Sequence, residues 1–84
     1  MLAKALPYIH KFIEELIKKQ IELKKIILYG SFVEGTATKE SDIDLKVIIK
    51  YKNDEKKVLK VENEINKKIL KDKYKFFLSS YIAT

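Results

Sequence analysis

The stretch from Ile26 to Ile49, IILYGSFVEGTATKESDIDLKVII, decides the fold of this chain. Its first four residues form a continuous apolar run that stops at Gly30, which is typical of a strand buried on both faces. Its last part alternates between apolar and polar residues from Asp42 to Tyr51. One face of this second run consists of Ile43, Leu45, Val47, Ile49 and Tyr51. The stretch therefore predicts two strands joined by a loop, and the second strand has a core face and an open face.

Two carboxylates stand at the start of the second predicted strand. Asp42 and Asp44 are two residues apart, so both lie on the open face with Cα atoms about 6.5 Å apart. If the two strands pair antiparallel, the end of the first one, Gly30–Ser31, lies beside these acids. Two like charges this close together call for a compensating cation, and oxygen ligands are those that Mg²⁺ prefers.

The loop residues next to these acids are suited to hold a phosphate. Gly30 lets the backbone approach a ligand closely, and Ser31 with nearby N–H groups could bind a phosphate oxygen, particularly if a short helix begins there. Ser41 and Lys46 are further candidates for nucleotide contacts. The pattern indicates metal-assisted phosphoryl or nucleotidyl transfer. A purely structural interpretation is the alternative, because an Asp-x-Asp sequence on an alternating strand often belongs only to the solvent-exposed face of a sheet.

Gly30-Ser31, ten intervening residues and then Asp42-Ile43-Asp44 resemble the signature of the DNA polymerase beta-like nucleotidyltransferase superfamily. The amino-acid sequence of the stretch looks most similar to that of the minimal nucleotidyltransferases, the small partners of HEPN-domain proteins in toxin–antitoxin pairs. The resemblance implies that Asp42 and Asp44 are the catalytic residues and bind the metal, Mg²⁺ or Mn²⁺. It also implies that Gly30 and Ser31 contact the phosphates of a nucleoside triphosphate, the substrate.

Two positions depart from the family pattern. Members often have an Arg just before the second Gly of the loop, where this chain has Glu34. Members also take a third carboxylate from a later strand, and the segment 74–83 offers only Ser79 and Ser80 there. Two functions follow. The first is transfer of a nucleoside monophosphate, with ATP as the expected donor, to a hydroxyl acceptor on a HEPN partner. The alternative is a catalytically degenerate antitoxin module that binds a nucleotide or a partner.

Composition sets the outer bounds of the assignment. The chain has 84 residues, so we expect a single domain over residues 1–84. Its net charge is +6, but all 18 basic residues are Lys, whereas Arg is preferred for bidentate phosphate and base recognition. We therefore do not expect a nucleic acid to be the main partner. No apolar run has the length of a membrane span, there is no cysteine, and the cytoplasm is the expected location. A homodimer is a further expectation.

The remaining segments predict two helices and a third strand. Helical spacing predicts a first helix over residues 2–22, regular from about Pro7, with a core stripe of Leu6, Ile9, Ile13, Leu16, Ile17 and Gln20. A second helix is predicted after an N-cap at Asn53–Asp54, with its stripe at Val58, Val61, Ile65 and Ile69. An aromatic-rich strand follows over residues 74–83, and a crossover makes it parallel to the second strand. The expected fold is α+β, a small mixed sheet with helices on one face, in the order helix, strand, short helix or loop, strand, helix, strand.

Overall fold

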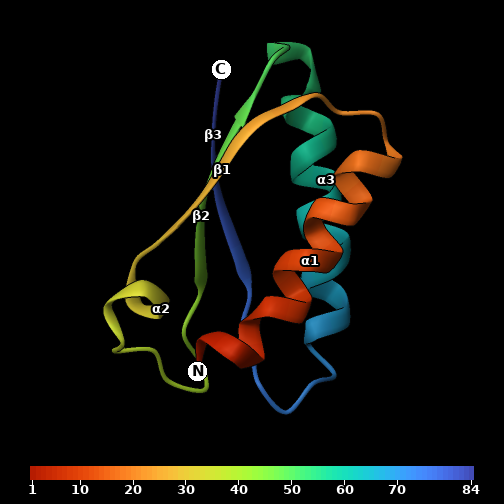
Figure 1. Ribbon diagram of the computed structural model, residues 1–84. Coiled ribbons are helices and arrows are strands. Elements are labelled where there is room, and N and C mark those ends of the chain that lie inside the picture. The colour runs from red at the N-terminus through yellow and green to blue at the C-terminus, as the bar shows by residue number, and fades with distance from the viewer.

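The computed structural model describes residues 1–84, and its two long helices, α1 and α3, lie beside a three-stranded sheet (Figure 1). Its elements are α1 (Leu2–Lys18), β1 (Leu23–Tyr29), α2 (Ser31–Glu34), β2 (Ile43–Ile49), η1 (Lys52–Asp54), α3 (Glu55–Ile69) and β3 (Leu78–Ala83). The helices α1 and α3 lie together on one side of the sheet, and α2 projects from the loop between β1 and β2 (Figure 1). The predicted order of elements and the α+β class are confirmed.

The sheet is mixed, and β2 is its central strand. β1 pairs antiparallel with β2, which places Tyr29 opposite Asp44. β3 pairs parallel with β2, which places Ser79 opposite the same Asp44. The helix α3 forms the crossover between these two parallel strands. The sheet thus presents one face to α1 and α3 and leaves the other face without a covering layer.

The alternation of β2 supplies the centre of the core. Ile43, Leu45, Val47 and Ile49 are fully buried beneath the helices. The predicted fifth member of this face, Tyr51, is exposed, because β2 ends at Ile49 before the chain turns into η1. On α3 the predicted stripe is confirmed, since all four of its residues are buried. An Asp54 cap begins α3 as expected, although its side chain makes no capping hydrogen bond and pairs instead with Lys57.

The core stripe predicted for α1 is only partly correct, because Ile9 and Leu16 are buried and Ile13 packs against the core, whereas Leu6, Ile17 and Gln20 are exposed. The buried residues are Ala5, Ile9, Phe12 and Leu16, spaced i, i+4, i+7 and i+11. Ile17 is 62% exposed, and Gln20 lies beyond the helix in a left-handed conformation with φ 61°. Turning the helix this way buries Phe12, whose aromatic ring removes more apolar surface from water than Ile17 would.

The start and end of α1 also differ from expectation. The helix begins at Leu2, not near Pro7, and it ends at Lys18. Pro7 lacks an N–H, so the first turns of the helix lack one intrahelical hydrogen bond, which is tolerable near a helix start. A backbone hydrogen bond from Ile21 to the carbonyl of Leu16 then closes the end of the helix.

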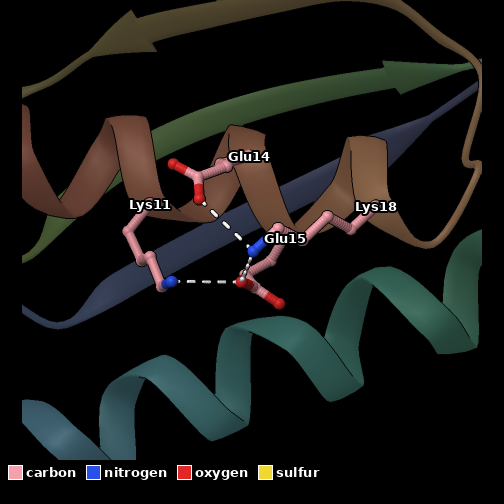
Figure 2. Close-up of polar contacts among 4 residues, drawn as sticks. All are labelled: Lys11, Glu14, Glu15 and Lys18. Carbon is pink, nitrogen blue, oxygen red and sulfur yellow. Dashed lines mark hydrogen bonds and ion pairs between the residues drawn. The ribbon is translucent and has the colours of Figure 1, made fainter.

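Ion pairs line the outer side of α1 (Figure 2). Lys18 pairs with Glu14 at 3.4 Å. Glu15 contacts Lys11 at 3.1 Å and Lys18 at 3.4 Å (Figure 2). The hydrogen bond from Lys11 lowers the pKa of the Glu15 carboxyl. These groups are exposed, so the pairs contribute little to stability.

The first strand is not buried on both faces, contrary to the prediction. β1 is an edge strand, and its side chains alternate between half-buried and exposed from Ile26 onward. Ile26 and Leu28 face the helices, whereas Ile27 and Tyr29 lie on the uncovered face of the sheet. The apolar run alone could not show this, because continuous apolar runs are typical of strands covered by helices on both faces.

Side chains of α3 cover the outer edge of β3. The amide of Asn66 accepts the N–H of Leu78 at 2.8 Å and donates to its carbonyl at 3.0 Å. The carboxylate of Glu62, a buried residue, accepts the N–H of Ser80 at 2.6 Å. An edge strand would otherwise present unpaired backbone groups. These bonds therefore close one edge of the sheet.

The aromatic residues around β3 divide between core and surface. Phe76 is fully buried, Phe77 is half-buried and Tyr81 is 61% exposed. The strand begins only at Leu78, so Phe76 and Phe77 belong to the segment that leads into it. Tyr8 of α1 packs edge-on against Phe76, and its hydroxyl donates a hydrogen bond to Asp72 at 2.7 Å, which raises the pKa of Tyr8 to about 12.

No α-helix in the structure combines the length and apolarity needed to cross a membrane.

Adjacent residues on α1 test the corrected stripe. Replacing Leu16 with Ala removes a fully buried side chain and is expected to lower the free energy of unfolding by about 2–5 kcal/mol. Replacing Ile17 with Ala is expected to change it by less than about 1 kcal/mol, because that side chain is mostly exposed. Urea denaturation followed by circular dichroism measures both values. A larger cost for Ile17→Ala would restore the stripe predicted from the sequence.

The hydrogen bonds from Asn66 of α3 to the edge of β3 can be tested with a second pair of matched variants. Asn66→Ala leaves the Leu78 backbone without two partners and is expected to cost about 1–3 kcal/mol. Asn63→Ala, one turn earlier on the exposed side of α3, is expected to lower the free energy of unfolding by only a few tenths of that amount. Hydrogen exchange of the Leu78 amide should accelerate only in the Asn66 variant. Equal exchange in both variants would show that the edge does not depend on Asn66.

Candidate functional site

A row of three residues crosses the uncovered face of the sheet at one end. Opposite residues of paired strands lie on the same face of a sheet, and Tyr29 of β1, Asp44 of β2 and Ser79 of β3 are opposite one another. Asp42 lies two residues before Asp44 and is exposed. Asp42 directly precedes β2, and from the alternation that begins at Ile43 we expect its side chain on the same side of the chain as Asp44. We refer to Asp42, Asp44, Tyr29 and Ser79 as the acid row.

The turn after β1 is packed against the second acid of this row. Gly30 has φ 83° and ψ −154°, a conformation essentially restricted to glycine. A Cβ added there would lie 3.1 Å from Asp44 Cγ and would collide with Asp44 Oδ2. The backbone at Gly30 and the carboxylate of Asp44 are therefore in direct contact. The prediction that the Gly-Ser turn and this acid lie beside each other is in accord with the structure.

Local packing fixes the orientation of this turn. The carbonyl of Gly30 accepts the N–H groups of Val33 and Glu34, each at 3.0 Å, so a single helical turn, α2, starts at Ser31. Phe32 points into the core and contacts the ring of Phe76 edge-on, with centroids 5.1 Å apart. Glu34 is exposed at the end of α2, where it remains a departure from the family pattern. Ser31 is thereby held, half-buried, directly after Gly30.

The two acids carry no compensating charge from the chain. The five ion pairs of the structure involve Glu14, Glu15, Glu22 and Asp54, and neither Asp42 nor Asp44 takes part in one. This is notable in a chain with 18 lysines. Adjacent carboxylates without a partner favour the binding of a cation. Their oxygen donors suit a hard divalent ion such as Mg²⁺ or Mn²⁺.

The donor set offers two carboxylates and no third. No group of three or more His, Cys, Asp or Glu residues converges anywhere in the structure. The position on β3 that is opposite Asp44 in the parallel pairing is occupied by Ser79. Asp42 and Asp44 are thus compatible with a cation, and the β3 residue opposite Asp44 carries a hydroxyl and no carboxylate.

The two remaining predicted nucleotide contacts are neighbours of the acids along the chain, because Ser41 directly precedes Asp42 and Lys46 follows Asp44 by two residues. The hydroxyl of Ser41 accepts the N–H of Thr38 at 2.7 Å and so helps to order the loop before β2. Lys46 lies on the uncovered face, opposite Ile27 and Tyr81. Its ammonium nitrogen lies 5.8 Å from the centroid of the Tyr81 ring. Lys46 therefore belongs to the row next to the acid row.

The turn at Gly30 and the two acids do not line a common cleft. Two of the three surface depressions lie along η1 and α3, the third lies between α3 and Phe77, and none includes a residue of the acid row. The acid row is instead open to solvent, because no element covers that face of the sheet. Sequence reasoning also missed Tyr29 as a member of the row. The alternation of β1, read in antiparallel register with β2, would have identified it.

The comparison with known families agrees with this geometry. A family model described as "Polymerase beta, Nucleotidyltransferase" matches residues 11–83, which includes the acid row, the turn at Gly30 and all three strands. Neither a curated protein nor a solved structure matches the chain.

Replacing Gly30 with Ala tests the contact with Asp44. Gly35 also has a positive φ but has nothing within 4 Å of an added Cβ, so Gly35→Ala is a control for backbone strain. We expect Gly35→Ala to cost about 1 kcal/mol and Gly30→Ala at least twice that. Urea denaturation measures both.

The share of Asp44 in this cost is isolated by a double-mutant cycle. In an Asp44→Ala background, Gly30→Ala should lose part of its penalty, because the colliding carboxylate is gone. An unchanged penalty in that background would mean that Gly30 and Asp44 are not in contact.

Proposed function

The chain belongs to the polymerase beta nucleotidyltransferase family, and from this we propose that it transfers a nucleoside monophosphate from a nucleoside triphosphate to a hydroxyl acceptor. The observation that carries the proposal is the contact between Gly30 and the unpaired carboxylate of Asp44. It brings a phosphate-binding type of turn and a cation-binding type of acid pair to one place.

Each residue of the site has a distinct role in this proposal. The Gly30 backbone, which carries no side chain of its own, and the Ser31 hydroxyl hold the terminal phosphates of the triphosphate. Asp42 and Asp44 hold Mg²⁺ or Mn²⁺, which when bound neutralises charge on the triphosphate and on the departing pyrophosphate. Lys46, on the neighbouring row, supplies a positive charge near the anionic substrate. ATP is the donor that we would test first.

The open face of the sheet suits a large acceptor. No element of the chain covers the acid row, so a side chain presented by another protein can approach it. We propose on the family resemblance that this partner is a HEPN-domain protein and that the pair acts as a toxin–antitoxin system. The partner would then also exclude water from the site, which the chain does not do alone.

A second candidate function rests on Ser79. Because Ser79 stands opposite Asp44 where the family places a third carboxylate, the chain could bind a nucleotide or a partner without catalysis. Such a module would retain magnesium-dependent nucleotide binding but would not release pyrophosphate. The two candidates are therefore separated by one comparison of binding with turnover.

The proposal predicts magnesium-dependent binding of ATP that requires Asp44. Asp44→Asn preserves the shape of the side chain but removes its charge, so ATP affinity in the presence of Mg²⁺ should fall on the order of tenfold or more. The control is Glu64→Gln on the exposed side of α3, which should bind like the wild type. Titration calorimetry with and without Mg²⁺ measures the affinities.

Turnover is measured as pyrophosphate release in the presence of a hydroxyl acceptor. Release by the wild type and its loss in Asp44→Asn would support the enzyme. Binding without release would favour the degenerate module. An affinity that is the same for the wild type and Asp44→Asn, or the same without Mg²⁺, would contradict both candidates.

A further inference from the structure

The two adjacent serines of β3 have opposite surroundings. Ser79 is exposed on the uncovered face, directly across from Asp44 on the neighbouring parallel strand. Ser80 points the other way, its hydroxyl is buried without a hydrogen-bond partner, and its N–H is held by Glu62. Of these two serines, only Ser79 therefore offers a hydroxyl to a molecule bound at the acid row.

The strand order fixes on which side of the acids this hydroxyl lies. Because β2 lies between β1 and β3, Gly30 and Ser79 stand on opposite sides of Asp44. Phosphoryl-group transfer requires the attacking oxygen and the leaving oxygen to be roughly in line on opposite sides of the phosphorus. If the pyrophosphate is held on the β1 side at Gly30–Ser31, the attacking oxygen must come from the β3 side. The first hydroxyl on that side is Ser79.

We propose that Ser79 is itself an acceptor, so that the chain attaches a nucleoside monophosphate to its own Ser79 Oγ. The inference rests on the proposed function, because it needs a nucleoside triphosphate bound at the acid row. It adds a modification site and explains what a serine would do in the position that faces Asp44. A neighbouring strand lies only about 4.8 Å away, which is close enough for an intramolecular attack once the nucleotide is seated.

The reaction balances with the groups already named. A bond forms between Ser79 Oγ and the α-phosphorus, and the bond from that phosphorus to the bridging oxygen of the β-phosphate breaks. Pyrophosphate leaves with the electron pair of the broken bond. The proton of the hydroxyl passes to water, which reaches Ser79 because the residue is exposed. The product is a phosphodiester that carries a nucleoside over the acid row.

The modification has a consequence for the site. A nucleoside monophosphate on Ser79 occupies the face that a second triphosphate would need, so each chain reacts once and then stops. The pyrophosphate formed should level off near one equivalent per chain when no other acceptor is present. Because the attack is within one chain, the rate constant should not depend on the protein concentration.

Labelling experiments test the proposal on the full chain. Wild-type protein incubated with Mg²⁺ and ATP should retain label from the α-phosphate but not from the γ-phosphate. Ser79→Ala should lose the label at least tenfold, and Ser79→Thr should keep it because the hydroxyl is restored. Ser80→Ala is the matched control and should be labelled like the wild type, since its hydroxyl is buried. Mass spectrometry of the peptide that contains β3 locates the modified residue.

The outcomes separate this proposal from the function on which it rests. Label that persists in Ser79→Ala, or that is located on the exposed Tyr81, would overturn the assignment of Ser79. Wild-type protein that binds magnesium ATP by calorimetry but takes up no label would overturn self-modification and leave the nucleotide site in place. Wild-type protein that binds no magnesium ATP would overturn both.

Discussion

The structure depends on the close approach of two strands at the point where Gly30 meets Asp44. The carboxylate lies against a backbone position that cannot carry a side chain, both for lack of space and because its conformation excludes other residues. This contact joins the end of β1 to the start of β2 and places Ser31, the first residue of α2, directly after the glycine that touches the acid. The predicted phosphate-binding turn and one predicted metal ligand are brought together by it.

The rest of the fold supports this contact asymmetrically. The helices α1 and α3 bury one face of the sheet, and Asn66 and Glu62 satisfy the outer edge of β3. No such layer covers the acid row, although a small domain gains stability from every apolar surface that it buries. The exposed Ile27, Tyr29 and Tyr81 lie on the same open face. The chain thus concentrates its stability on one side of the sheet and leaves the side with the acids accessible.

The sequence predicts the structure best where one face of a helix or strand is buried and the opposite face is exposed to solvent. The alternation of β2 and the stripe of α3 predicted the buried residues correctly, and the antiparallel return of the chain brought Gly30 next to Asp44. The rotation of α1 could not be predicted, because apolar residues cover a wide arc of that helix and only packing decides between Phe12 and Ile17. The exposure of β1 and the absence of a cleft depend on which layers cover the sheet, which a local pattern does not encode.

The central claim, that the acid row and the Gly30 turn form one site for a divalent cation and a nucleotide, is tested most directly by paramagnetic nuclear magnetic resonance. Mn²⁺ broadens the signals of nearby nuclei and can replace Mg²⁺ at oxygen ligands. When Mn²⁺ is added at substoichiometric concentration together with ATP, the amide signals of Gly30, Asp44 and Ser79 should broaden first. The amide signals of Lys60 and Asn63, on the outer side of α3, should stay sharp. Broadening centred on α3, or spread evenly over the lysine-rich surface, would contradict the account.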